Sequence, residues 1–247
     1  MLMSILYLFL ALLPVVAYIM IIWATTPWGS IELRKSAQYF LTGIISIGLL
    51  LTFFRLFPNW QSPVSPTNLS LSFMVLAFIQ VALMEELCKF AAFKINEGIR
   101  GEDDIKYDSP IGTMFYCGIS ALGFSFIENV EYAIMYGGHV LVVRSFISMM
   151  VHFLCGLIMG YWISASRIPS RLENRSLMEV VFIKKPVLKR VVYSAIGITC
   201  AVILHGLFDY NIFTDGHVVS NYLIILGGII ATYLASKDLN DRVRKIH

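Results

Sequence analysis

The sequence predicts an all-α fold, a polytopic transmembrane bundle of about seven helices. Hydrophobic residues make up 57% of its 247 residues and charged residues only 14%, whereas a soluble domain carries roughly 25% charged residues. The apolar residues lie in runs of about 20, the length with which an α-helix crosses the ~30 Å hydrocarbon core of a bilayer. No stretch between these runs is long enough to fold by itself, so we expect residues 1–247 to form a single transmembrane domain.

The apolar runs lack the alternation of a lipid-facing β-strand, so each is predicted to be a helix. The predicted helices are residues 4–24, 37–57, 69–94, 110–136, 140–166, 188–213 and 218–236. The first has no basic segment before it and no Ala-x-Ala-like cleavage site, which favours a retained helix over a signal peptide. Helix-breaking residues follow the second, third, fourth and sixth helices: Pro58 and Pro63, Gly101, Gly137-Gly138, and Thr214-Asp215-Gly216.

Lysine and arginine are concentrated in alternate connectors, and this pattern predicts the orientation of the bundle. They lie in the first, third and fifth connectors and in the tail, whereas only Arg55 and Arg144 lie near the others. Because cytoplasmic loops carry the excess of basic residues, we expect the N-terminus outside and the C-terminus in the cytoplasm. The segment 170–186 is predicted to be a short interfacial helix or a solvated loop. The net charge of +3 gives no indication of a nucleic-acid partner.

Ionisable residues inside the predicted helices are the second informative feature. On insertion scales each costs ~2.5–3.5 kcal/mol at the centre of a helix, so each needs a partner, a water-filled cavity or a metal. In the third helix Glu85 and Lys89 are four residues apart in the favourable order for an ion pair, and Glu86 is turned about 100° away. One carboxylate can therefore pair with Lys89 while the other faces a different partner.

The fourth and fifth helices add one acidic group and one imidazole. Glu128 shares a helix face with Tyr132 and is followed by the amide of Asn129. Glu131 lies nearer the outer interface, where we expect it to be hydrated. The fifth helix carries His152 among apolar neighbours, a position that by itself is typical of a packing residue.

The sixth helix carries His205 and Asp209, which are four residues apart and stack on one face. The carboxylate can fix the tautomer of the imidazole, or both groups can ligate one ion. We expect His139 and His217, in outer turns, to be solvated, and Arg144 to anchor its helix at the interface.

Carboxylates from two helices and imidazoles from two others predict one shared polar site. The helix register places them only roughly at one depth, with Glu85 deeper toward the cytoplasm, so a tilt or a shifted helix boundary is needed to bring them together. Glutamate, histidine and aspartate are the ligands of hydrolytic divalent-metal sites with an open position. A buried carboxylate can also act directly on water as a general base.

Motifs of other hydrolases are missing from the sequence, which has no serine nucleophile elbow, no His-Glu-x-x-His pair and no glycine-rich phosphate loop. The four cysteines lie in apolar runs and are expected to be buried thiols. Cys155 lies three residues from His152 but has no recognisable triad partner.

The chain resembles the PrsW family of intramembrane proteases, which looks like a relative of the CAAX prenyl protease and bacteriocin-processing group. The resemblance covers roughly residues 75–213, within a motif-bearing core of about residues 69–213. Its motifs occur in the expected order: Glu85-Glu86-x-x-Lys89, Phe124-x-x-x-Glu128-Asn129, the His152 helix and His205-x-x-x-Asp209.

This resemblance implies a peptidase of the bacterial plasma membrane that cleaves a membrane-anchored regulator, such as an anti-sigma factor, outside or near the outer face. It implies a catalytic centre of Glu85, suggested as general base, with Glu86, Glu128, His152 and His205, supported by Lys89, Asn129 and Asp209. The sequence leaves open which of the two adjacent glutamates is the base. Asp209 and Glu128 stand where the CAAX protease group has Asn and His. This more anionic site favours a divalent metal such as zinc, with Glu128, His152 and His205 as ligands, although a metal-free mechanism stays open.

The same residues allow two other hypotheses. Chains of carboxylates and histidines also mark proton paths in transporters, although the sequence has no inverted repeat and no pair of Gly/Pro-broken helices. A non-enzymatic membrane adaptor would use the polar groups as interhelical contacts. A protease needs the groups to converge on a cavity, a transporter needs access from both sides, and an adaptor needs paired, dry contacts.

Overall fold

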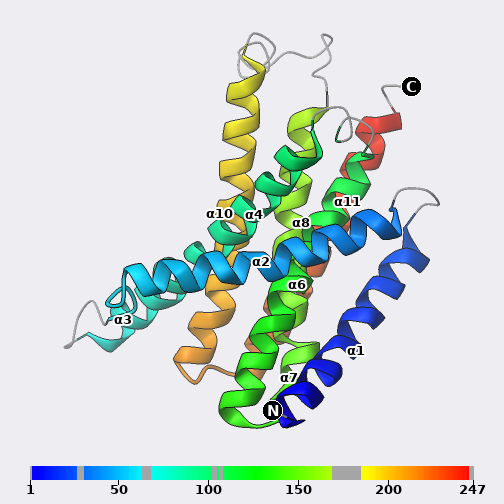
Figure 1. Ribbon diagram of the computed structural model, residues 1–247. Helices are drawn as coiled ribbons and strands as arrows, with labels where there is room; N and C mark the ends of the chain where they lie inside the picture. Colours follow the sequence, from blue (N-terminus) through cyan, green and yellow to red (C-terminus); the bar gives the residue numbers. More distant parts are fainter. Residues whose placement is uncertain are drawn as a thin grey trace.

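The computed structural model describes residues 2–26, 31–62, 68–101, 105, 108–168 and 185–244, and the regular elements within these ranges are all helical (Figure 1). A π-helix, η1, lies between α3 and α4. In chain order the elements are α1 (Leu2–Thr25), α2 (Leu33–Leu56), α3 (Leu69–Val75), η1 (Leu76–Leu83), α4 (Met84–Arg100), α6 (Pro110–Tyr136), α7 (Val140–Phe146), α8 (Ser148–Arg167), α10 (Pro186–Phe213) and α11 (Val218–Arg244).

Within the described residues, 7 helical stretches are long and apolar enough to cross a membrane, which confirms the predicted all-α bundle. The chain is a multi-span membrane protein. The third span, Leu69–Arg100, joins α3, η1 and α4, and the fifth, Val140–Arg167, joins α7 and α8. Residues 170–184 of the segment for which the sequence predicts an interfacial helix or a loop lie outside the described residues.

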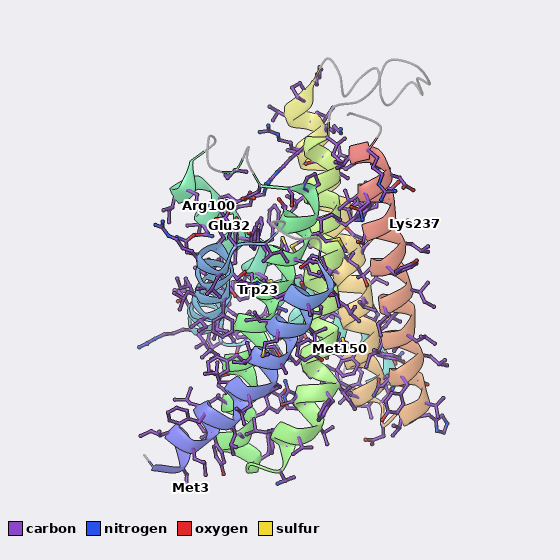
Figure 2. The ribbon with its side chains drawn as sticks, turned by 90° about the vertical axis from the view of Figure 1, so that its right-hand side faces the viewer. Met3, Trp23, Glu32, Arg100, Met150 and Lys237 are labelled. Carbon is purple, nitrogen blue, oxygen red and sulfur yellow. The ribbon has the colours of Figure 1, made fainter. Side chains whose placement is uncertain are left out.

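Helix α6 forms the centre of the bundle. It is buried along most of its length, from Ile111 to Ala133, and it packs against α1, α2 and α8, while α8 packs in turn against α10 and α11. Helix α2 crosses this group at a steep angle (Figures 1 and 2). The peripheral helices α1 and α11 expose large apolar side chains such as Phe9 and Tyr233, as expected of helices that face lipid.

Two glycines allow α2 and α6 to cross in backbone contact. A Cβ atom on Gly43 would overlap the carbonyl oxygen of Ser120, and a Cβ atom on Gly123 would overlap that of Phe40. Small residues at a crossing are the usual means of close helix approach in membranes. This crossing holds α2 against the part of α6 that leads to Glu128.

Replacement of Gly43 by valine is expected to destabilise the protein by about 1–3 kcal/mol or more, because α2 and α6 must separate to admit the side chain. Thermal unfolding of the purified protein in detergent measures the loss. Gly48→Val is the matched control on the same helix, since a Cβ atom there meets nothing within 4 Å. An equal loss for the two variants would contradict the close approach seen at Gly43.

Buried ion pairs connect the polar C-terminal end of α4 to the start of α2 and to Asp108, which precedes α6. Asp108 accepts from Lys35 at 2.8 Å and from Arg100 at 2.8 Å, and Arg100 also donates to the hydroxyl of Tyr39 at 2.7 Å. Figure 2 shows Arg100 near Glu32, at the start of α2. These contacts fix the direction of α4, the helix that carries the adjacent glutamates.

The π-helix η1 directly precedes these glutamates and is tied to the α2–α3 connector. The side-chain amide of Gln80 donates to the carbonyl oxygens of Trp60 and Ser62 at 2.5 and 3.1 Å, and the indole of Trp60 donates to the carbonyl of Gln80 at 3.1 Å. π-helical turns are rare in proteins, and those that occur are often found at functional sites. Here the π segment sets the rotation at which α4 begins and therefore the directions of Glu85 and Glu86.

Candidate functional site

Lys89 lies inside a buried cluster of charges on α4. Its Nζ atom is 2.8 Å from Glu86 Oε1 and 3.6 Å from Glu85 Oε2, and it lies 4.1 Å from the centre of the Phe124 ring. The spacing of the sequence favours Glu85 as its partner, but the closer carboxylate is Glu86, which points into the bundle and is fully buried. The ammonium therefore compensates mainly the charge of Glu86, the burial of which would otherwise be costly.

His152, on α8, has a partner at both ring nitrogens. Lys89 Nζ lies 2.8 Å from Nδ1, and Glu128 Oε2 lies 2.8 Å from Nε2. Because an ammonium group donates and cannot accept, we assign the acceptor role to Nδ1 and the hydrogen to Nε2, which donates to Glu128. His152 is thus part of the charged cluster and more than a packing residue.

His205, on α10, is held from one side only. Its Nδ1 atom donates to Glu86 Oε1 at 2.9 Å, so that when the ring is neutral the other nitrogen, Nε2, carries a lone pair. That nitrogen lies 3.4 Å from Asp209 Oδ2 and 3.8 Å from Glu85 Oε2. Both oxygens are buried and have no hydrogen-bond partner among the described residues. The rings of His205 and His152 meet edge to face, with centroids 4.8 Å apart.

With a neutral ring, the facing atoms of His205, Asp209 and Glu85 therefore all carry lone pairs, and none of the three is a donor. Three such atoms repel one another unless a cation, a proton or a water molecule lies between them. Bonds of about 2.1 Å around a tetrahedral ion place neighbouring ligand atoms ~3.4 Å apart, close to the two distances at His205 Nε2. Ligand atoms of Glu85, His152 and His205 also lie within 4.8 Å of one another. Glu85 and His205 belong to both groups, and with Asp209 or His152 as a third donor they fit a divalent metal.

Arg144, on α7, points into the bundle instead of anchoring its helix at the interface, which corrects the expectation from the sequence. Its guanidinium group contacts Glu128 Oε1 at 2.9 Å, its Nε atom donates to Asn129 Oδ1 at 2.9 Å, and its central carbon lies 3.6 Å from the centre of the Tyr132 ring. The physical reason is that Glu128 is largely buried and needs a nearby cation.

Access to the cluster is one-sided. The side chains of Glu128 and Arg144 are 15% and 17% exposed and that of Asp209 is 14% exposed, whereas Glu86 and Lys89 are 0% and 4% exposed. The more accessible groups belong to α7 and to the halves of α6 and α10 that lead to Tyr136 and Phe213, at the same end of the bundle (Figure 1). The connectors at this end carry few lysines and arginines.

A small cavity with room for about one water molecule adjoins the buried part of the cluster. Glu86 and Ser120 line it, together with Lys89 and apolar side chains. Glu86 Oε2 and Ser120 Oγ have no hydrogen-bond partner among the described residues.

The structure brings the predicted catalytic residues together from four helices. Glu85, Glu86 and Lys89 come from α4, Glu128 from α6, His152 from α8, and His205 and Asp209 from α10. Glu85 Oε2 lies 3.8 Å from His205 Nε2, so the difference in depth expected for Glu85 is absent, and the third span runs obliquely to α6 (Figure 1). Their catalytic roles stay predictions. Asn129 is buried but reaches the cluster only through Arg144.

Other expectations concern residues outside the cluster. His139 and His217 are exposed, as predicted. Cys88, Cys117 and Cys155 are buried thiols, and the thiol of Cys155 lies 3.4 Å from the carbonyl oxygen of Ala201, so it adds no nucleophile with a base beside it.

The chain is similar in sequence to membrane proteases. A family model described as PrsW family intramembrane metalloprotease matches residues 33–235. The protease PrsW of Oceanobacillus iheyensis is 26% identical over 164 residues, 66% of each chain. That of Shouchella clausii is 23% identical over 188 residues, 75% of each chain. The chain thus covers just under two thirds of the length of the first of these relatives. No solved structure matches the chain.

Proposed function

Because the chain belongs to the PrsW family of intramembrane metalloproteases, we propose that it hydrolyses a peptide bond of a membrane-anchored protein at the group formed by Glu85, His205 and Asp209. The observation that carries the proposal is the position of His205 Nε2, 3.4 Å from Asp209 Oδ2 and 3.8 Å from Glu85 Oε2, two buried carboxylate oxygens without hydrogen-bond partners among the described residues. Such a group suits the activation of a water molecule that attacks a carbonyl group.

Glu85 is the better general base of the two adjacent glutamates. Both contacts of Glu86 Oε1, from Lys89 and His205, hold that carboxylate in place, and Glu86 is fully buried. Glu85 Oε2 has no hydrogen-bond partner among the described residues, so it can accept a proton from water while the water oxygen attacks the carbonyl carbon. Glu85 then returns the proton to the leaving amine. Glu86 orients His205 through Nδ1, as carboxylates orient histidines in many hydrolytic centres.

The residues that would hold a metal are His205 through Nε2, Asp209 and one carboxylate oxygen of Glu85, which leaves the second oxygen of Glu85 for the proton. When bound, a divalent metal such as zinc supplies Lewis-acid polarisation of the carbonyl group and of water. The set of Glu128, His152 and His205 stays a prediction of the resemblance. The partners at both nitrogens of His152 favour the group formed by Glu85, His205 and Asp209.

The substrate that we propose is a single-pass regulatory protein of the anti-sigma-factor kind, cut near the outer end of its helix. The more accessible groups of the cluster lie at the end whose connectors carry few lysines and arginines, and the positive-inside rule predicts that this end lies outside. A scissile bond must leave its helix to react, and non-helical backbone is tolerated at membrane depth only inside protein or water-filled cavities. A site among the polar side chains of the cluster meets this requirement.

The arrangement of the cluster argues against the two other hypotheses. An adaptor needs paired, hydrogen-bonded polar contacts, but Glu85 Oε2 and Asp209 Oδ2 have only ion contacts of 3.4 Å or longer and no hydrogen-bond partner among the described residues. A transporter needs access from both sides, whereas the accessible side chains of the cluster, Glu128, Arg144 and Asp209, lie toward one end.

Replacement of His205 by alanine is expected to lower cleavage at least 100-fold, because the centre loses the imidazole that faces Glu85 and Asp209. The assay uses purified protein and a library of single-pass substrates with scissile bonds at different depths. His139→Ala is the matched control, since His139 is exposed, and it is expected to cleave at the wild-type rate.

Cleavage measured with and without a chelator distinguishes the metal-assisted mechanism from the metal-free one. Loss of cleavage on chelation, with recovery on addition of zinc, supports the metal-assisted form. Unchanged cleavage after chelation supports direct action of Glu85 on water. Cleavage by His205→Ala at the wild-type rate would remove the proposed centre in either form.

A further inference from the structure

We propose that Arg144 is a positioning residue of this centre, which holds Glu128 on His152 and so fixes the tautomer of the His152 ring. The proposal divides the cluster into two parts. In the closed part, Arg144, Glu128, His152 and Lys89 satisfy one another, and in the open part His205 faces Glu85 and Asp209. The effect on cleavage rests on the proposed function, whereas the effect on the His152 ring does not.

Three residues of α6 contact the Arg144 side chain and hold it in place. The guanidinium group contacts Glu128 Oε1 at 2.9 Å, donates to Asn129 Oδ1 at 2.9 Å and stacks on the ring of Tyr132. Asn129 is fully buried. A planar group with fixed donors is suited to such a site, and an ammonium group cannot reproduce all three contacts. The contacts leave Glu128 with its other oxygen aimed at His152.

The two ends of the closed part impose one tautomer on His152. Lys89 lies 2.8 Å from Nδ1 and can only donate, and Glu128 lies 2.8 Å from Nε2 and as a carboxylate can only accept. The ring is therefore neutral with its hydrogen on Nε2. Without Arg144, Glu128 loses the contact that aims it, and the hydrogen bond that defines one end of the ring is weakened.

This fixed ring matters for the open part of the centre. Lys89 also contacts Glu86 Oε1, and Glu86 in turn holds His205 Nδ1. The chain of contacts from Arg144 thus reaches His205 through four charged or polar side chains, each within hydrogen-bond distance of the next. A loosened His152 changes the position of Lys89 and, through Glu86, the direction of the His205 lone pair.

Arg144 also belongs to a separate helical segment. Helix α7 ends at Phe146 and α8 begins at Ser148, with Ile147 between them. The arginine and the histidine that it positions therefore lie on opposite sides of a helix break. The docking of α7 on α6 becomes a condition for the correct geometry of the centre.

The test compares Arg144→Gln, Arg144→Lys and the control Arg55→Gln. Arg55 is exposed on α2 and is an arginine at the same side of the predicted bundle. For Arg144→Gln we expect kcat to fall about 10- to 100-fold with KM within about twofold, because the residue aligns the centre without touching substrate. Arg144→Lys is expected to recover part of kcat, and Arg55→Gln to match the wild type.

A spectroscopic readout separates positioning from mere folding. Ring nitrogen NMR of histidine-labelled protein is expected to show His152 with a protonated Nε2 and an unprotonated Nδ1 in the wild type, and a mixture of tautomers in Arg144→Gln. An unchanged tautomer, or an unchanged kcat, in a folded Arg144→Gln variant would overturn the proposal, as would a rise in KM alone. If the wild type cleaves no substrate, the proposed function fails, and the NMR comparison still decides the role of Arg144.

Discussion

Replacement of Glu85 by glutamine is expected to lower the rate of cleavage about 10²- to 10⁴-fold, the usual contribution of a general base, while the protein stays folded. Glutamine has nearly the same shape as glutamate but cannot accept the proton of the attacking water. Glu85 Oε2 has no hydrogen-bond partner among the described residues and lies 3.6 Å from Lys89 Nζ, whose closer partner is Glu86, so the substitution removes only a long ion contact there. Single-turnover cleavage and thermal unfolding of the same preparation measure the two quantities.

Two further variants make this prediction specific to Glu85. Glu86→Gln is expected to lower stability as well as rate, because the Glu86 carboxylate carries the contacts from Lys89 and His205. Glu131→Gln, the same chemical change at a less buried position on α6, is expected to leave both quantities unchanged. Wild-type cleavage by Glu85→Gln, or a loss of rate accounted for by unfolding, would transfer the role of base to another residue.

The seven spans could be predicted because a bilayer imposes a single length on apolar runs. The prediction for the third span stopped at residue 94, whereas the helix continues to Arg100. Its last turns are polar, and ion pairs such as that of Arg100 with Asp108 stabilise them. Hydropathy reports only the part of a helix that lipid covers, so it could not detect this extension.

The members of the site could be predicted because charges inside a membrane are costly and therefore informative. Their pairing could not, since Glu85 and Glu86 are adjacent in the sequence and the π-helix η1 sets their rotation. Nothing in the residues Leu76–Leu83 distinguishes a π-helix from an α-helix. The contacts of Gln80 with Trp60 and Ser62 that accompany it join residues about 20 positions apart.

The sequence predicts an interface position for Arg144 because this residue lies near an outer connector, and the signal that indicates otherwise is its distance from the turn. The tight turn at Gly137-Gly138 makes α6 and the following span antiparallel neighbours. Arg144 and Glu128 lie on opposite sides of this turn at comparable distances from it. Two opposite charges at similar depth in a helical hairpin are expected to pair, and that reasoning would have placed Arg144 in the cluster.

Replacement of Lys89 by methionine is expected to destabilise the protein by about 3–5 kcal/mol, the cost of leaving a buried charge without its partner. The side chain of Lys89 is 4% exposed, and its Nζ atom lies 2.8 Å from Glu86 Oε1. Methionine fills similar space but brings no charge and no donor, so Glu86 keeps only its contact with His205. Equilibrium unfolding in detergent or bicelles measures the change.

The same helix contains a matched control for this prediction. Lys94 pairs with Glu97 at 2.9 Å, again three residues apart, but the side chain of Lys94 is 38% exposed. Because ion pairs of partly exposed groups contribute about 0–1 kcal/mol, Lys94→Met is expected to cost much less. Equal losses at the two lysines would show that burial of the ammonium is not what makes Lys89 important.

The double variant Glu86→Gln/Lys89→Met tests whether the loss comes from the uncompensated carboxylate. Replacing both members of a buried ion pair by neutral groups is often neutral or stabilising, so the double variant is expected to be more stable than Lys89→Met alone. Its cleavage is expected to stay low, because His205 loses the anion that orients it and His152 loses the donor at Nδ1. Recovered stability without recovered activity is the result expected if this pair serves the alignment of the centre more than the stability of the fold.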